Sequence, residues 1–156
     1  MKNQTKPTPD VKTMFSQLES TLDLYFDKKA PAMPDSVKEA LVKYGPYLTA
    51  ILMFMALPII LGLLGFGAMM SPFAYMGGFR YGLGFSFGLL FTIAILIMQG
   101  LSLPALFKRQ KSGWNLMFYV ALLQAVQNLL RFNLGGLIIG SAISFYILFQ
   151  IKSYYK

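Results

Sequence analysis

The side chains best suited to bind a solute gather on one helical face late in the chain. Four polar residues fall at positions i, i+3, i+4 and i+7: Gln124, Gln127, Asn128 and Arg131. A helix brings such positions within about 100° of one another. They could form a polar vestibule that coordinates a solute, with Arg131 and Arg80 attracting anions. Alternatively, the amides hydrogen-bond neighbouring helices and Arg131 sits at the lipid headgroups. The sequence favours this second, structural interpretation.

Groups that perform acid–base, thiol or metal chemistry are scarce. The chain has no Cys and no His, which excludes disulfides, thiolate nucleophiles, Cys/His zinc sites and histidine-based catalysis. All acidic residues lie within the first 46 residues, so the remainder of the chain has no carboxylate for a proton relay or a cation site. We therefore predict a non-enzymatic protein without a cofactor or a metal site.

The apolar residues predict four membrane-spanning helices. The chain is 156 residues long, 56% hydrophobic and only 13% charged, unlike a soluble domain with about 25% charged residues. Spanning about 30 Å of hydrocarbon takes about 20 helical residues. Four uncharged runs reach or approach this length and predict spans at about 47–70, 81–103, 114–130 and 134–151. The expected fold is an all-α polytopic membrane domain over residues 47–156.

The basic residues predict the orientation of these spans. Seven lysines precede the first span, and five further cations would share their side of the membrane: Lys108, Arg109, Lys111, Lys152 and Lys156. Only Arg80 and Arg131 would lie on the other side. By the positive-inside rule, both termini are expected in the cytoplasm, with the chain in the inner (plasma) membrane. No cleaved signal peptide is expected. The cations flank apolar runs and form no polar face, so nucleic-acid binding is not expected.

The cytoplasmic segment 1–46 is expected to begin with an amphipathic helix over about 10–28. Its apolar stripe has a 4-3-4-3 spacing and consists of Val11, Phe15, Leu18, Leu22 and Tyr25. The stripe packs either on the rest of this protein or on a partner. The polar face carries acids, which disfavour an anionic membrane surface.

Prolines divide the region that follows. A linker is expected at 30–35, because Pro31 and Pro34 block helix continuation. A juxtamembrane helix is expected over 36–44, with an elbow at Gly45 and Pro46 leading into the first span. Pro58 lies midway along that span and predicts a kink there.

Two further groups of residues suggest contacts of the membrane domain. The first is a small-xxx-small pattern that lets helices approach closely: Gly136, Gly140 and Ser144. The second is a basic turn that could bind anionic lipid headgroups: Lys108, Arg109 and Lys111.

Three segments carry a resemblance to known sequences. They are LFKRQKSGWNLMFY at 106–119, GG at 135–136 and LFQIKSYYK at 148–156. Their overall pattern resembles uncharacterised small four-helix integral membrane proteins of bacteria, of the candidate-phyla type. The resemblance covers the membrane domain. It implies no activity, so no functional residue is carried over from it.

These observations lead to one expected function and two alternatives. The expectation is a structural or accessory subunit that docks a partner membrane protein through its N-terminal amphipathic helix. The first alternative is a small homo-oligomeric channel or carrier for an anion or neutral solute, lined by the polar residues of the third span. The second is a lipid-binding membrane protein. In each case the lipid bilayer is the surrounding partner.

Overall fold

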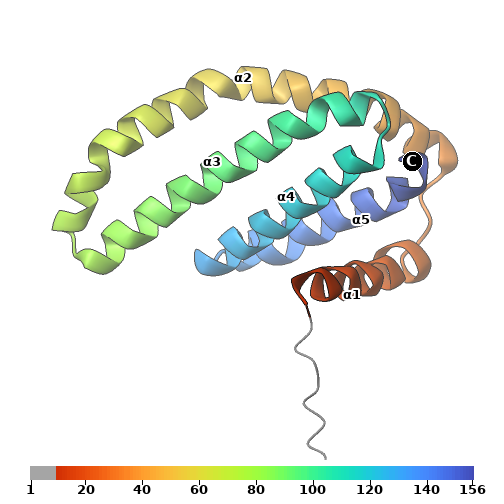
Figure 1. Ribbon diagram of the computed structural model, residues 1–156, viewed down its shortest axis with the longest axis horizontal. Coiled ribbons are helices and arrows are strands. Elements are labelled where there is room, and N and C mark those ends of the chain that lie inside the picture. The colour runs from red at the N-terminus through yellow and green to blue at the C-terminus, as the bar shows by residue number, and fades with distance from the viewer. Residues whose placement is uncertain (1–9) are drawn as a thin grey trace, which may run out of the picture.

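The computed structural model describes residues 10–156, and all regular secondary structure in that range is helical (Figure 1). The long helices are α2 over Asp35–Met76, α3 over Phe79–Phe107 and α4 over Lys111–Leu130. The N-terminal helix α1 covers Val11–Asp23 and continues as the π-helix η1 over Leu24–Lys29. The last helix consists of η2 over Gly136–Gly140, α5 over Ser141–Ile151 and η3 over Lys152–Tyr154. The predicted all-α class is confirmed. Lys2 and Lys6, part of the topology prediction, lie outside the described residues.

The helices differ in whether they are long and apolar enough to cross a membrane. Gly82–Phe107 and Gly136–Tyr154 are each long and apolar enough to cross a membrane. A third crossing is possible if the two halves of α2, Asp35–Met55 and Ile60–Met76, form one bent span. Helix α4 is not among these candidates, because its amides lower its mean hydropathy. The described residues therefore support two or three spans, fewer than the four expected.

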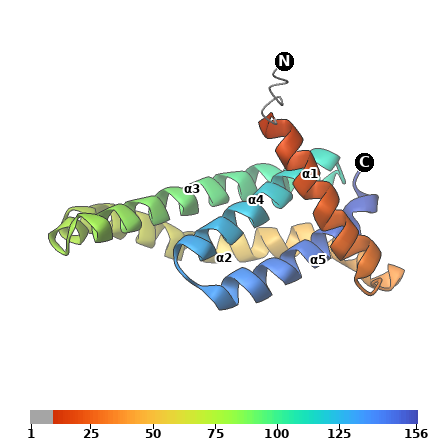
Figure 2. The ribbon, with the colours of Figure 1, turned by 90° about the horizontal axis from the view of Figure 1, so that it is seen from below.

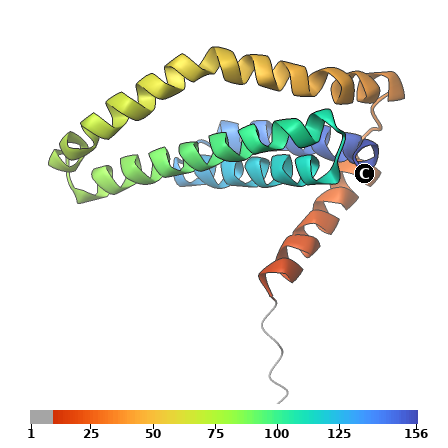
Figure 3. The same ribbon diagram turned by 45° about the horizontal axis from the view of Figure 1, so that its top comes forward.

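The helices form two hairpins of unequal length. The α2–α3 hairpin turns tightly at Gly77 and Gly78, where Gly78 has a φ of 116° that a side chain would strain. Helices α4 and α5 form a shorter hairpin, so the turn of the first hairpin projects beyond the turn of the second (Figure 1; Figure 3). Helix α3 packs against both α2 and α4 and joins the two hairpins.

Helix α2 departs from the prediction at one proline and follows it at another. The elbow expected at Gly45 and Pro46 was wrong, because α2 runs continuously through both residues. Val42 and Pro46 are buried in the bundle, and this packing offsets the hydrogen bond that a helical proline removes. The expected juxtamembrane helix 36–44 is thus the first part of α2. The kink predicted at Pro58 is present, with a 46° bend between the two halves of α2.

The best-packed part of the protein lies at one end of the bundle. The chain's C-terminus, the α3–α4 turn and the start of α2 meet there (Figure 2; Figure 3). Trp114 is 1% exposed and stacks on Phe118 with ring centroids 5.5 Å apart. Its indole Nε1 donates a hydrogen bond to the Leu148 carbonyl at 2.7 Å. This contact fixes α4 against α5.

Candidate functional site

The polar residues of α4 are divided among different environments. Gln127 faces α3, and its Nε2 lies 3.4 Å from both the Gly88 carbonyl oxygen and Thr92 Oγ1. Asn128 faces the turn after α4, where its Oδ1 accepts a hydrogen bond from Asn133 Nδ2 at 3.3 Å. These two amides make the contacts between neighbouring segments that the structural interpretation expects.

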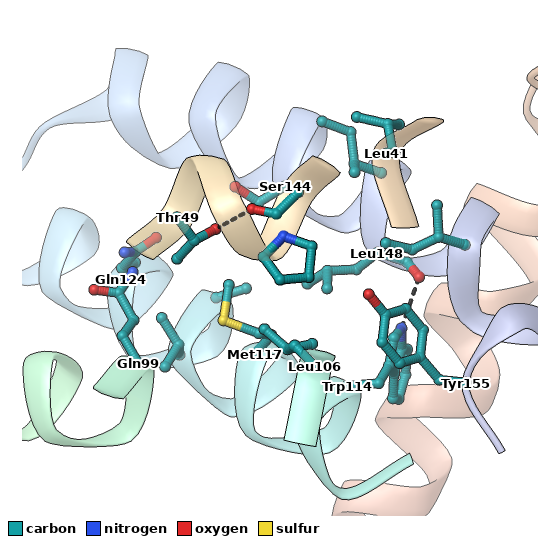
Figure 4. A pocket seen from close by; sticks show the side chains of 16 residues that line it. Leu41, Thr49, Gln99, Leu106, Trp114, Met117, Gln124, Ser144, Leu148 and Tyr155 are labelled. Carbon is teal, nitrogen blue, oxygen red and sulfur yellow. Dashed lines mark hydrogen bonds between the residues drawn. The ribbon is translucent and has the colours of Figure 1, made fainter. Parts of the chain in front are cut away.

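Gln124 lines a cavity between α2, α3, α4 and α5, which we call the inner cavity. The cavity has a volume of about 210 Å³. Its wall is mostly apolar, and Thr49, Gln99 and Ser144 are among its other polar lining residues. Figure 4 shows the two glutamines toward one side of the view and Trp114 with Tyr155 toward the other. Arg131 is not among the residues that line this cavity, so the four predicted residues do not line one common cavity.

A larger cleft opens between the second half of α2 and the first half of α3. We call it the outer cleft. Its volume is about 1510 Å³, and the C-terminal end of α4 closes one side of it. Arg80, Gln127 and Arg131 line it together with apolar side chains of α2 and α3. Both predicted arginines thus line the outer cleft.

Arg131 approaches α3 closely within the outer cleft. A Cβ added at Gly88 would lie only 3.0 Å from Arg131 Nη2. The guanidinium therefore rests over a glycine surface, two helical turns along α3 from Arg80. Among residues 10–156, ion pairs join only Lys38 to Asp35 and Lys152 to Glu19 and Asp23. Neither arginine of the cleft has a carboxylate partner in the described structure.

The three residues of the predicted small-residue ridge have different surroundings within this chain. Gly136 lies against the turn after α4, where an added Cβ would meet Asn133 Nδ2 at 2.7 Å and Asn128 Oδ1 at 2.8 Å. A Cβ at Gly140 would meet nothing within 4 Å, and Ser144 lines the inner cavity. Of the two glycines, Gly136 alone makes a close approach within the described part of this chain.

The apolar stripe of the N-terminal helix is part buried and part exposed. Leu22 packs against the core, and the Phe15 ring contacts the Tyr119 ring of α4 with centroids 5.7 Å apart. Val11, Leu18 and Tyr25 remain 64%, 43% and 53% exposed. The stripe therefore uses one flank against this protein and leaves the other flank free.

Three residues at the end of the chain hold the N-terminal segment, and the sequence analysis missed their role. Gln150 is 2% exposed; its Oε1 accepts a hydrogen bond from the Met33 N–H, and its Nε2 donates one to the Phe26 carbonyl. Tyr146 donates its hydroxyl to the Pro31 carbonyl at 2.8 Å. The sequence does contain one indication of this role: Gln150 is a lone amide at the end of an apolar run, and a buried amide requires hydrogen-bond partners.

The third of these residues, Lys152, pairs with two acids of the N-terminal helix. Its Nζ lies 3.0 Å from Asp23 Oδ1 and 3.1 Å from Glu19 Oε1. The same ammonium lies 5.3 Å from the centre of the Trp114 ring. The acids on the polar face of α1 thus turn toward a cation at the end of α5.

The basic turn between α3 and α4 is exposed, with Arg109 in a left-handed conformation at φ 52°. The C-terminus pairs with it, because the Lys156 N–H bonds to the Arg109 carbonyl and the Lys111 N–H bonds to the Lys156 carbonyl. Nearby Tyr155 is 6% exposed. Burial raises the pKa of Tyr155, and the charge of Arg109 opposes this only in part. Lys108, Arg109 and Lys111 are all exposed, and their binding to lipid headgroups stays a prediction.

Comparisons with protein-family models, curated proteins and solved structures found no match to this chain. Within residues 10–156, no three His, Cys, Asp or Glu side chains gather where they could hold a metal ion. The candidate site therefore rests on the geometry of the outer cleft and of the N-terminal helix.

Proposed function

We propose that this chain is a four-span protein of the inner (plasma) membrane with both termini in the cytoplasm. Helix α4 is the fourth span in this proposal: its 20 residues extend about 30 Å, the thickness of the hydrocarbon core. The C-terminus and the basic α3–α4 turn share one end of the bundle, which supports placing their cations on one side of the membrane.

Within that membrane, the proposed role is that of a non-enzymatic accessory subunit. One observation carries this proposal: the N-terminal segment is fixed to α5 while one flank of its apolar stripe stays exposed. Gln150 and Lys152 hold the segment by hydrogen bonds and ion pairs. Val11 and Leu18 are displayed at its surface. A helix held in place loses little conformational freedom when it binds a partner.

The proposed partner is another membrane protein. Helix α1 lies across α4 and α5 (Figure 2), so a partner that covers its free flank also meets these helices. Two acids of α1 are already paired with Lys152. The free flank is therefore mainly apolar, and an apolar helix surface at the edge of the membrane matches it.

The test is photo-crosslinking in the organism's own membranes. A photoreactive residue replaces Val11 or Leu18 in the stripe, and matched controls replace Thr13 or Gln17 on the opposite face of α1. We expect one other membrane protein to be captured at both stripe positions and at neither control position. That protein must also co-purify in native mass spectrometry and be lost with Val11→Ser and Leu18→Ser together.

Substitution is preferable to deletion of residues 1–29. Deletion would also remove Phe26, which bonds to Gln150 of α5, and Glu19 and Asp23, which pair with Lys152 of η3, and so would disturb the bundle itself. Capture of a second copy of this chain, or of lipid alone, would overturn the accessory-subunit proposal.

A further inference from the structure

We propose that the outer cleft binds one anionic phospholipid. Its phosphate would lie between Arg80 and Arg131, and an acyl chain would run along the apolar wall formed by α2 and α3. This inference does not depend on the docking role of the N-terminal helix.

The size and lining of the cleft match an elongated amphiphile. Its volume of about 1510 Å³ exceeds the roughly 300–1,000 Å³ of common small-molecule sites. The wall includes Leu63 and Leu64 from α2 and Leu89 and Phe91 from α3. A single hydrated anion would leave most of this apolar surface without a partner.

The charges in the cleft favour a negative headgroup. Arg80 and Arg131 line it, and no acid occurs after residue 39 to neutralise them. Charged side chains at membrane depth face the bundle interior or a cavity and are normally paired. A lipid phosphate accepts hydrogen bonds from guanidinium groups, often two at once.

The two arginines lie beside different levels of α3, Arg80 near its start and Arg131 about two turns farther along. Arg131 contacts the position of Gly88, which is eight residues from Arg80, or about 12 Å along a helix. Because α4 fills the hydrocarbon core in our proposal, Arg131, which follows its last residue, lies at the outer boundary of that core. Arg80 lies farther out, on the headgroup side. This places one cation beside the phosphate and one below it, close to the start of the acyl chains.

Two glycines of α3 keep the cleft open. A Cβ at Gly84 would meet nothing within 4 Å, and one at Gly88 would meet only the Arg131 guanidinium. Both glycines line the cleft. Gly84 therefore offers a position in the cleft lining where an added Cβ meets no described atom, and a larger side chain there would occupy the cleft.

The experiment uses the full chain in nanodiscs of phosphatidylglycerol and phosphatidylcholine. A trace of either lipid carries a photoreactive group on its acyl chain, and mass spectrometry locates the labelled peptides. We expect phosphatidylglycerol to label residues 60–70 and 84–92 saturably, with phosphatidylcholine a poor competitor. Each of Arg80→Gln and Arg131→Gln should weaken this binding about fivefold, and the pair about thirtyfold.

Matched variants separate the cleft from other lipid contacts. Gly84→Leu should abolish the labelling, whereas Gly140→Leu, at a position equally free of contacts, should not. Arg109→Gln with Lys111→Gln removes two cations from the exposed turn and should leave the cleft label unchanged. Circular dichroism and size-exclusion chromatography establish that each variant is folded.

Three results would overturn the proposal. The first is equal labelling by the two lipids, and the second is labelling that persists in both Gly84→Leu and the double arginine variant. The third is crosslinking of the cleft to a second protein chain in place of lipid.

Discussion

The Gln150 Oε1 atom lies 3.0 Å from the backbone nitrogen of Met33, which is 117 residues earlier in the chain. The amide nitrogen of the same side chain bonds to the Phe26 carbonyl at 2.9 Å. One buried side chain of α5 therefore satisfies two backbone groups of the N-terminal segment. Because of this bridge, residues 26–33 are part of the folded protein.

The first prediction concerns this bridge. Gln150→Met keeps a side chain of similar length but removes both hydrogen bonds, leaving the Met33 N–H and the Phe26 carbonyl without these partners. We expect a loss of about 2 kcal/mol in the binding of the N-terminal segment to α5. Trypsin should then cleave faster after Lys28 and Lys29, and the Met33 amide should exchange its hydrogen faster. Gln110→Met changes an exposed glutamine and serves as the control; equal protection in both variants would contradict the prediction.

The second prediction concerns Lys152. Lys152→Met keeps the aliphatic stem but removes the charge that pairs with Glu19 and Asp23 and lies over the Trp114 ring. Because these groups are partly exposed, we expect a loosening worth about 1 kcal/mol. Trp114 is the only tryptophan in the chain, so its fluorescence reports this change directly. Its emission should shift to longer wavelength, and acrylamide should quench it more strongly, because the indole ring becomes more accessible.

The matched control for Lys152 is Lys156→Met. It removes a cation from the same tail but none of the ion pairs found in the described residues. Added salt should weaken acrylamide protection in the wild-type protein and have little effect in Lys152→Met. Similar salt dependence in the two proteins would mean that Lys152 does not hold α1 electrostatically.

Much of the helical framework follows from the sequence because long uncharged runs have few other structures open to them. The runs predict helical segments that overlap α3, α4 and α5, and Pro58 predicts the bend in α2. The prediction of an elbow at Gly45 and Pro46 was wrong because tertiary packing outweighs the local tendency of these residues to break a helix. Burial of Val42 and Pro46 favours a continuous helix over a break.

The candidate site was harder to predict. The spacing of Gln124, Gln127, Asn128 and Arg131 places them on one side of a helix, but it does not specify what each side chain meets. The four span about 10 Å of helix, and over that length the neighbours change from the inner cavity to α3 and then to the following turn. The role of Gln150 was missed because its partners lie more than 100 residues away.

The third prediction compares two glycines of the predicted ridge. A Cβ from Gly136→Ala would displace Asn133 and Asn128 and weaken their hydrogen bond at the turn. The same substitution at Gly140 meets nothing. Alanine favours helix by about 1 kcal/mol over glycine at both positions. Gly140→Ala should therefore stabilise the protein, and Gly136→Ala should fall about 1–2 kcal/mol below it.

Thermal unfolding in detergent, followed by circular dichroism, measures this difference. Identical shifts for Gly136→Ala and Gly140→Ala would show that the close approach of Gly136 to the asparagines carries no energetic weight. A larger loss at Gly140 would instead indicate that this residue faces a second helix, as the small-xxx-small pattern suggests.

The fourth prediction concerns alkaline pH. Burial raises the pKa of Tyr155 above its usual value of 10.0, while the charge of Arg109 opposes the rise. The folded protein thus holds the phenol proton more tightly than the unfolded chain. The stability from this difference is fully present below pH 10 and is lost as the pH rises through the folded-state pKa. The Phe side chain in Tyr155→Phe cannot ionise, so the unfolding temperature of this variant should fall less steeply than that of the wild type above pH 10.

The control is Tyr44→Phe, at a tyrosine that is 59% exposed, and it should follow the wild-type profile of unfolding temperature against pH. Parallel profiles for Tyr155→Phe and the wild type would show that the C-terminal tail does not keep Tyr155 buried.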